Sequence, residues 1–515
     1  MQNKFNMSII NANGTMVLFF ANIISKLFGA FYRLPLSNIL GAEGMGLYQM
    51  AFPIYSFFLT LITGGVSITL TRQIAILRAK KDENGIYKNY ILGKNTSLLF
   101  GTIFFVAILI FSYPLSVLQG NINAFYGYLA IAIGFIFASL LGAYRGYYQG
   151  YSDMKPTAIS QVLEQTFKLS FGLLFAYVFL QYGINYGVFG ALFGISLSEI
   201  FSFVYFILFN KKHIQKRQVT INKGDYKNFI KQVAPVSLSY VILPLSSLID
   251  SFLVVNLLVA TGFVTPFATS LYGIETGMIL PLINMPNVLV SALALASLPE
   301  ISYKSSKGND VKKQVSLMFK IVFMFILPCA VGLFILARPI VALIFPTLDL
   351  NLLDIAVNLL RFSAFEMFFL SFVTISNSLL QALGKIKLPA ISLSIGIVIK
   401  IIFTIIFVFN KSLNIYGLVL ASSLCYFISA TINVYYIKKL TNFRLKLIEI
   451  LAPIFASSIM TIVILILNMY FNFLKNFLGL CLIILFAVLT YFMSLILLKQ
   501  INFKEIKKSL QTKRG

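Results

Sequence analysis

The chain has few of the residues on which metal proteins and soluble enzymes depend. Its 515 residues include no tryptophan, three cysteines, one histidine and only 16 acidic residues. The single histidine, His213, excludes a His/Cys metal cluster. Cys329, Cys425 and Cys481 all lie in apolar runs, so a disulfide framework is not expected. No GxxxxGK[ST] motif is present, so a P-loop nucleotide site is not expected either.

Charge is also scarce, and apolar residues take its place. Charged residues make up 11% of the chain and hydrophobic residues 59%, whereas a soluble domain has about 25% charged residues. Apolar runs long enough to span a bilayer number about fourteen. They lie near residues 14–38, 45–71, 91–113, 122–144, 157–180, 186–209, 229–258, 271–298, 317–337, 353–380, 389–409, 415–437, 448–470 and 475–498. The sequence therefore predicts an all-α polytopic membrane protein with about 14 transmembrane helices.

The basic residues predict how the chain is oriented. The net charge is +25, and in a soluble protein such an excess indicates nucleic acid binding. Here most basic residues lie in alternate loops, namely 72–94, 145–155, 211–231, 299–320 and 438–446, and in the tail after residue 498. The positive-inside rule explains this pattern. We therefore expect a bacterial plasma membrane protein with both termini in the cytoplasm and no nucleic acid partner.

Five basic residues lie inside the predicted spans, where charge is costly. They are Lys26, Arg33, Lys168, Arg361 and Lys400. Lys26 lies roughly 15 Å into the first span, near the middle of the bilayer. A charge at that depth costs at least about 2.5–3.5 kcal/mol and usually faces a protein interior or a water-filled cavity. The alternative is that the side chains snorkel to the interface. We expect these five residues to bind a substrate head group.

Acidic residues inside the spans are candidates for ion coupling. They are Asp250, Glu199, Glu366, Glu164 and Glu275. Such a carboxylate can bind H⁺ or Na⁺ during transport, and no other cofactor or metal is expected. Glu164 lies four residues before Lys168, which is also the favourable spacing for a helical ion pair. Under that alternative the two charges neutralise each other.

Proline and glycine interrupt many of the spans. Pro53, the Gly64–Gly65 pair and Pro328 are examples. Proline kinks a helix and frees a carbonyl group. Transporters place such breaks at binding sites and hinges, although proline is also an ordinary shape-setting residue of membrane helices.

The two halves of the chain repeat each other. Gln149, Lys155, Ala158-Ile159-Ser160 and Lys168 recur 232 residues later as Gln381, Lys387, Ala390-Ile391-Ser392 and Lys400. The repeat predicts two pseudo-symmetric six-helix lobes of the same orientation, as in rocker-type transporters. We expect an N-lobe at 1–210, a basic cytoplasmic linker at 211–228, a C-lobe at 229–440, and two extra helices with a basic tail at 441–515.

Four stretches carry a resemblance to a known family. They are SKLFGAFYRLPLSNILGAEGMGLYQMAFPIY at 25–55, GGVSITLTRQIA at 64–75, YYQGYSDMKPTAISQVLEQTFK at 147–168 and YGIETGMILPLINMPNVLVSALALASLPEIS at 272–302. The chain resembles the stage V sporulation protein B group of polysaccharide biosynthesis proteins, in the multidrug/oligosaccharidyl-lipid/polysaccharide (MOP) exporter superfamily. Related lipid II flippases carry arginines in spans 1, 2 and 8. This chain keeps Arg33 and Lys26 near the first site and lacks the other two arginines.

The resemblance implies a flippase and not an enzyme. Its substrate would be an undecaprenyl-pyrophosphate-linked sugar precursor, lipid II or a relative, moved across the cytoplasmic membrane by alternating access. The two extra helices would form a groove for the lipid tail, and membrane lipid and cell-wall synthesis enzymes are the expected partners. The alternatives are a cation-coupled multidrug exporter, a non-transporting scaffold for wall-synthesis enzymes and a membrane-bound glycosyltransferase. The buried cations argue against an exporter of cationic drugs and have no role in a scaffold. A glycosyltransferase needs acidic residues outside the membrane, and the outer loops offer only Glu43, Asp349 and Asp354.

Overall fold

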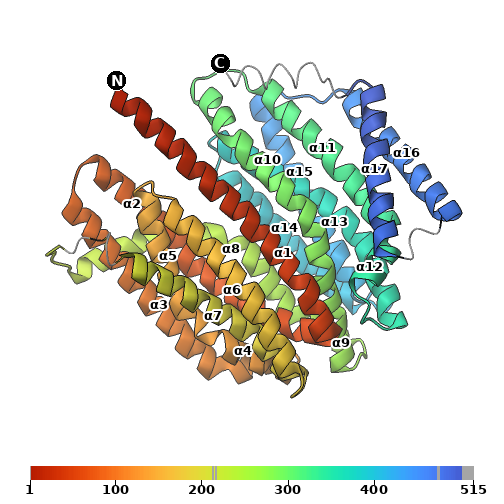
Figure 1. Ribbon diagram of the computed structural model, residues 1–515, viewed down its shortest axis with the longest axis horizontal. Helices are drawn as coiled ribbons and strands as arrows, with labels where there is room; N and C mark the ends of the chain where they lie inside the picture. The colour runs from red at the N-terminus through yellow and green to blue at the C-terminus, as the bar shows by residue number, and fades with distance from the viewer. Residues whose placement is uncertain (1, 211–213, 215–216, 472–475, 501–515) are drawn as a thin grey trace. The chain divides into compact units, whose positions relative to one another are not determined.

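The structure, a computed structural model, describes residues 2–210, 214, 217–471 and 476–500, and within these ranges it contains helices and no strands (Figure 1). The side chains of residues 2–20, 22, 23, 26, 30, 210, 239, 470 and 471 are not described. Twelve helices are long and apolar enough to span a membrane, and a bent pair, Ile122–Ala132 with Gly134–Gly150, adds a thirteenth span. One of the twelve, Leu27–Ala79, has 53 residues. At 1.5 Å per residue it is about 80 Å long, enough for two crossings of a 30 Å hydrocarbon core. The all-α fold with about fourteen spans is therefore confirmed.

The chain divides into two compact units. The first contains Met1–Leu282 and Thr404–Ile415, and the second contains Ile283–Phe403 and Tyr416–Gly515. The elements of the first unit are α1 (Gln2–Leu59), η1 (Thr60–Gly64), α2 (Gly65–Ala79), α3 (Glu83–Leu118), η2 (Ile122–Ala124), α4 (Phe125–Ala132), α5 (Gly134–Gly150), α6 (Lys155–Leu180), α7 (Ile184–Asn210), α8 (Lys223–Ala260), α9 (Thr265–Gly273) and η3 (Ile274–Ile279). These units are defined by contacts within the chain. They differ from the lobes expected from the sequence repeat, whose boundaries stay a prediction.

Within the first unit, α1 consists of two helical segments joined at Gly41. Gly41 has φ 67° and ψ −174°, a combination that essentially only glycine adopts. The turn lies beside α9 (Figure 1). Gly41 therefore separates the first two predicted spans, and it sets the direction in which the second one leaves.

We expect Gly41→Ala to destabilise the protein by about 1–3 kcal/mol, because a Cβ is strained in this backbone conformation. The cost is conformational, since a Cβ at Gly41 would meet no heavy atom within 4 Å. Gly332→Ala is the matched control, because its Cβ also meets no atom within 4 Å but residue 332 lies inside a helix, where alanine is favoured. Thermal unfolding in detergent measures both, and equal melting temperatures for the two variants would contradict the prediction.

Close helix packing holds the rest of the first unit together. A Cβ at Gly194 of α7 would lie 2.5 Å from the Cα of Gly172 in α6, so these two helices approach at their glycines. Small residues allow such contact in membranes, where dispersion forces and hydrogen bonds drive helix association. Aromatic residues fill the space between α3, α5 and α7, including Tyr90, Tyr144 and Phe206. This packing fixes α5, α6 and α7, which carry much of the site described below.

The second unit holds the remaining helices. They are α10 (Leu280–Ser306), α11 (Lys312–Ile335), α12 (Ala337–Ile344), α13 (Leu350–Ala382), α14 (Lys387–Phe409), α15 (Tyr416–Thr441), α16 (Leu447–Phe471) and α17 (Phe477–Leu497). The contact-based division places the start of α10 and the end of α14 in the first unit. The last two helices, in blue in Figure 1, lie side by side, and α16 packs against α11. They are the two extra helices of the sequence prediction.

A hydrogen bond of the same kind occurs in both units, and the residues that accept it are related by the sequence repeat. In the first unit, Ser202 Oγ of α7 donates to the carbonyl of Ser160 in α6 at 3.3 Å. In the second, Ser429 Oγ of α15 donates to the carbonyl of Ser392 in α14 at 3.1 Å. Ser160 and Ser392 are the pair that the sequence repeat matches. The donors Ser202 and Ser429 lie 227 residues apart and not 232, so the repeat relates the acceptors but not the donors.

Candidate functional site

Two cationic side chains share one aromatic ring inside the first unit. The Arg33 guanidinium lies 5.6 Å from the centroid of the Phe52 ring. The Lys168 ammonium lies 5.3 Å from the same centroid. Arg33 precedes the Gly41 turn of α1, Phe52 follows it, and Lys168 comes from α6. The fold therefore brings together two of the predicted head-group residues, and Phe52 joins them through cation–π contacts.

Neighbouring tyrosines hold this pair of cations in place. Tyr32 is 1% exposed, and its hydroxyl donates to the Ala191 carbonyl of α7 at 3.3 Å. The Lys168 ammonium also lies 5.3 Å from the Tyr32 ring centroid. Tyr48 stacks on Phe52 at 5.5 Å with an interplanar angle of 16°. Because Tyr32 and Tyr48 are fully buried, the half-buried cations next to them are positioned by rigid packing.

Neither cation at this site belongs to an ion pair among the described residues. Of the five ion pairs that the described residues form, none includes Arg33 or Lys168. Glu164 and Lys168 do not form an ion pair, although the charge of Glu164 still acts on Lys168. Glu164 Oε2 instead accepts from Arg145 Nη2 of α5 at 2.7 Å, and Arg145 Nε donates to Ser160 Oγ at 3.0 Å. Two cations with no carboxylate partner are suited to bind an anion such as a phosphate.

Glu199 is a candidate coupling carboxylate that a tyrosine connects to this ring cluster. It lies in α7, is 4% exposed, and accepts a 3.3 Å hydrogen bond from the Tyr55 hydroxyl. The Tyr55 ring in turn lies 6.3 Å from the Phe52 ring. One aromatic side chain therefore lies between the carboxylate and the ring that the two cations share.

The other predicted site residues lie elsewhere. Asp250 of α8 and Glu275 of η3 are buried in the first unit. Glu366 of α13 and Lys400 of α14 are buried in the second unit. Arg361 of α13 donates from Nη1 to Asn358 Oδ1 at 3.3 Å. The side chain of Lys26 lies outside the described residues, so its head-group role stays a prediction.

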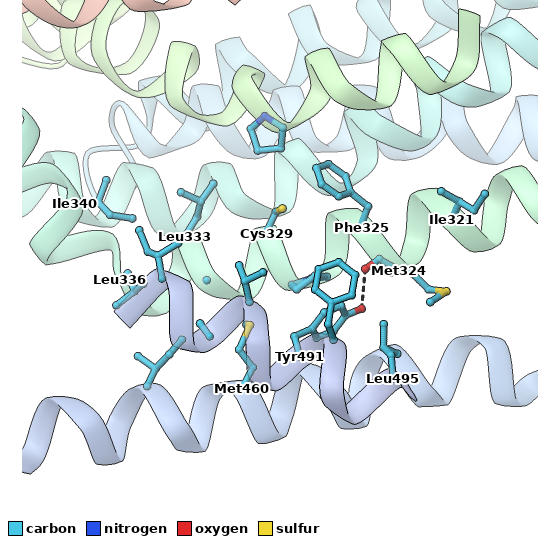
Figure 2. A pocket seen from close by; sticks show the side chains of 18 of the residues that line it. Ile321, Met324, Phe325, Cys329, Leu333, Leu336, Ile340, Met460, Tyr491 and Leu495 are labelled. Atoms are coloured by element: carbon cyan, nitrogen blue, oxygen red, sulfur yellow. Dashed lines mark hydrogen bonds between the residues drawn. The ribbon is translucent and has the colours of Figure 1, made fainter. Parts of the chain in front are cut away.

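The second unit contains an apolar cavity of about 540 Å³. Figure 2 shows its walls, which come from α10, α11, α12, α16 and α17. Leu333 and Phe325 of α11, Met460 of α16 and Leu495 of α17 are among the side chains that line it. Both extra helices therefore contribute to an apolar cavity, and its use as the groove for a lipid tail stays a prediction. A hydrocarbon chain is the kind of ligand that such walls accept.

A hydrogen bond joins two walls of this apolar cavity. The Tyr491 hydroxyl of α17 donates to the Met324 carbonyl of α11 at 2.6 Å, shown as the dashed line in Figure 2. Pro328 lies four residues after Met324 in the same helix. Because proline has no N–H, it leaves the carbonyl four residues earlier without its helical partner. Tyr491 supplies the missing donor and so ties α17 to the break in α11.

We expect Tyr491→Phe to lower the stability of the protein by about 0.6–1.7 kcal/mol, which are the average and the maximum measured for hydrogen bonds between membrane helices. In a Pro328→Ala background the new N–H can satisfy Met324, so the same substitution should cost much less. Thermal unfolding of the two single variants and the double variant forms a double-mutant cycle. Equal costs of Tyr491→Phe in both backgrounds would show that the proline is irrelevant to this bond.

Sequence reasoning missed three residues of these sites. Phe52 is one of many aromatic residues in an apolar run, and no signal distinguished it. Arg145 was assigned to a basic loop, but it lies inside α5. Its partner Glu164 is 19 residues away, so helical spacing could not indicate the pair. For Tyr491, the available signal was a proline in one span together with a lone tyrosine in another.

Comparison with known sequences agrees with these observations. A family model described as polysaccharide biosynthesis protein matches residues 12–303. Lipid II flippase MurJ of Bacillus subtilis (strain 168) is 24% identical over 460 residues, which cover 84% of each protein. Stage V sporulation protein B of the same organism is 24% identical over 309 residues, which cover 58% of the chain and 59% of that relative.

Solved structures share the fold. An inward closed structure of lipid II flippase MurJ aligns with a TM-score of 0.75 at 18% identity, over 94% of the chain and 99% of that structure. An inward-facing multidrug resistance transporter, a MATE family member of the MOP superfamily, aligns with a TM-score of 0.65 at 19% identity, over 81% of the chain and 94% of that structure. These alignments identify the architecture, and the predicted resemblance is confirmed.

Proposed function

Because the chain belongs to the polysaccharide biosynthesis protein family, with the fold of MOP superfamily transporters, we propose that it is a lipid-linked sugar flippase. Its cargo is an undecaprenyl-pyrophosphate-linked sugar precursor, lipid II or a related cell-wall, cortex or polysaccharide intermediate. The protein moves this cargo across the cytoplasmic membrane by alternating access. Both of its termini lie in the cytoplasm, and enzymes of wall synthesis use the product.

The observation that carries the proposal is the pair of cations on Phe52. A pyrophosphate head carries about two negative charges, and its transfer into hydrocarbon without compensation is prohibitive. Arg33 and Lys168 replace lost hydration with charge-assisted hydrogen bonds. The guanidinium can bind a phosphate in bidentate fashion, whereas the ammonium acts as a compact point charge. Neither has a competing ion pair among the described residues, which leaves both available to an anion.

The apolar cavity beside α16 and α17 supports the same cargo. A polyprenyl tail is a long hydrocarbon, and its contact with apolar walls releases water or lipid without any polar requirement. Leu333, Met460 and Leu495 present such walls. The tail therefore stays in an apolar environment while the charged head crosses.

The driving force in this proposal is electrical, ionic or both. Moving charge through the membrane potential is worth about 2.3 kcal/mol per charge per 100 mV. With the interior negative, outward movement of a doubly negative head is downhill by roughly twice that amount. Glu199 is the first choice for binding a coupling H⁺ or Na⁺, because a tyrosine links it to the cation-bearing ring.

The deciding experiment reconstitutes the full chain in proteoliposomes and measures flipping of fluorescent lipid II. Flipping above the rate of protein-free liposomes supports the proposal. Failure with lipid II but activity with another polyprenyl-linked glycan keeps the mechanism and changes the sugar. Transport of cationic drugs without movement of any lipid-linked sugar would overturn the proposal in favour of a multidrug exporter.

A further inference from the structure

The first unit contains a cavity of about 530 Å³ that is separate from the residues of the proposed head-group site. It lies between the start of α3, the end of α5 and the turn that leads to α6. Four of its lining residues are tyrosines: Tyr87, Tyr147, Tyr148 and Tyr151. Glu83, Asp153 and Arg217 supply charge. Glu83 and Asp153 fall in two of the basic loop segments, so the cavity lies at the basic-loop side of the spans.

Packing makes the aromatic wall of this cavity rigid. Tyr147 and Tyr148 are 6% and 3% exposed and meet edge to face at 5.3 Å. Tyr151 lies 5.0 Å from Tyr147. The guanidinium of Arg78 lies 5.7 Å from the Tyr151 ring centroid, and Arg78 also donates to the Tyr151 carbonyl. Rigid tyrosines provide broad amphipathic contact area at little entropic cost.

Polar groups of both kinds accompany this wall. Glu83 accepts a 3.2 Å hydrogen bond from the Tyr151 hydroxyl through Oε2. Asp153 Oδ1 accepts a 3.3 Å bond from the backbone N–H of Lys155. Neither carboxylate takes part in an ion pair among the described residues. The cavity therefore offers carboxylate acceptors, hydroxyl groups that can donate or accept, and the guanidinium donors of Arg217.

This mixture discriminates between classes of ligand. Two carboxylates repel an anion. Arg217 in the lining and Arg78 behind the wall repel a simple cation, and so do the lysines of the adjoining loops. A neutral polyhydroxylated ring meets every requirement. Its hydroxyls donate to the carboxylates, its oxygens accept from Arg217 and the tyrosines, and its less polar faces lie against aromatic rings.

We propose that this cavity is a binding site for a neutral sugar ring. The sugar comes either from the head group of the lipid-linked cargo or from a soluble sugar. A site for the head-group sugar of the cargo rests on the flippase proposal. A site for a soluble sugar is independent of that proposal. In both cases Asp153 is the main hydrogen-bonding group, because it is half-buried and Glu83 is already engaged by Tyr151.

A tryptophan reporter tests this proposal directly. The natural chain has no tryptophan, so Tyr87→Trp in the full-length protein places a single indole in the cavity wall. We expect its emission to change saturably with N,N′-diacetylchitobiose and not with sodium phosphate or tetramethylammonium. Adding Asp153→Asn should weaken sugar affinity about tenfold, through loss of a hydrogen bond to a charged group. Tyr177→Trp, at a residue that is 71% exposed on α6, is the control and should not respond.

Two results would overturn the proposal: no saturable response of the Tyr87→Trp protein to the sugar, or an equal response to tetramethylammonium. If Tyr87→Trp does not fold, thermal unfolding of the tryptophan-free protein with the disaccharide replaces it. Stabilisation that Asp153→Asn abolishes supports the site, and stabilisation of both proteins alike, or none, rejects it.

Lipid II flipping by Asp153→Asn then identifies the source of the sugar. Slower flipping assigns the site to the cargo, and an unchanged rate together with lost sugar binding assigns it to a soluble sugar. Sugar binding in a protein that flips nothing keeps this site while the flippase proposal fails.

Discussion

Lys168→Ala is expected to reduce the rate of lipid II flipping by about tenfold to a hundredfold. The lost interaction is a charge-assisted hydrogen bond to the pyrophosphate, worth about 1.5–3 kcal/mol. We expect Arg33→Ala to have an effect of similar size, because its guanidinium lies on the same Phe52 ring. Arg33→Lys should recover part of the activity, since it keeps the charge and loses the bidentate geometry.

The matched control for Lys168 is Lys307. Its ammonium also lies over a tyrosine ring, 4.5 Å from the centroid of Tyr303, but its side chain is exposed at the end of α10. Lys307→Ala removes a lysine and a cation–π contact without touching the proposed site. It should flip lipid II at the rate of the unmodified protein. If Lys168→Ala folds and also flips at that rate, the cations on Phe52 do not bind the head group.

Arg145→Ala is expected to cost about 3 kcal/mol of stability, the largest loss that we predict for a single substitution. Its partner Glu164 would lose this ion pair and keep only the 3.2 Å hydrogen bond from Gln165 and the more distant charge of Lys168, with 18% of its side chain exposed. Breaking a buried ion pair from one side typically costs 3–5 kcal/mol, and the lower end applies because some exposure remains. Arg145 also donates to Ser160, so its loss affects two contacts between α5 and α6.

Replacing both partners with apolar residues distinguishes the effect of the unpaired charge from the effect of lost packing. Arg145→Met with Glu164→Leu removes both charges and keeps similar volume, and such replacements are often neutral or stabilising. Thermal unfolding in one detergent should therefore rank the double variant well above Arg145→Ala. If the double variant is as unstable as Arg145→Ala, the shape of the arginine and not the unpaired charge explains the loss.

The sequence predicted the features that depend on residues close together in the chain better than those that depend on distant residues. The spans depend on local hydropathy, and all fourteen predicted runs fall on helices of the structure. Lys168 was predicted because a charge in an apolar run is conspicuous. The spacing of Glu164 and Lys168 did not predict the ion pair that forms. Helical spacing shows which residues of one helix share a face, but not which residue of a neighbouring helix lies close to them. Arg145 of α5 forms the ion pair with Glu164.

Long-range contacts made the rest unpredictable. Phe52 joins Arg33 and Lys168 only because Gly41 turns α1 back between residues 33 and 52. Tyr491 meets Met324 across 167 residues. The tyrosine cavity gathers residues from three separate loop ends. In each case the residue types were visible in the sequence, and their meeting depended on tertiary packing.

The repeated serine bonds allow the two halves to be compared as copies that have diverged. The position 232 residues after Arg145 is Asn377, whose Oδ1 accepts from Asn433 Nδ2 at 2.7 Å. Asn433 Oδ1 also accepts from Ser392 Oγ at 2.7 Å. One half thus holds this junction with an ion pair and the other with neutral amides. An ion pair carries two full charges between its helices, whereas the amides carry none. A lost partner would therefore leave a charge between the helices only in the N-terminal half.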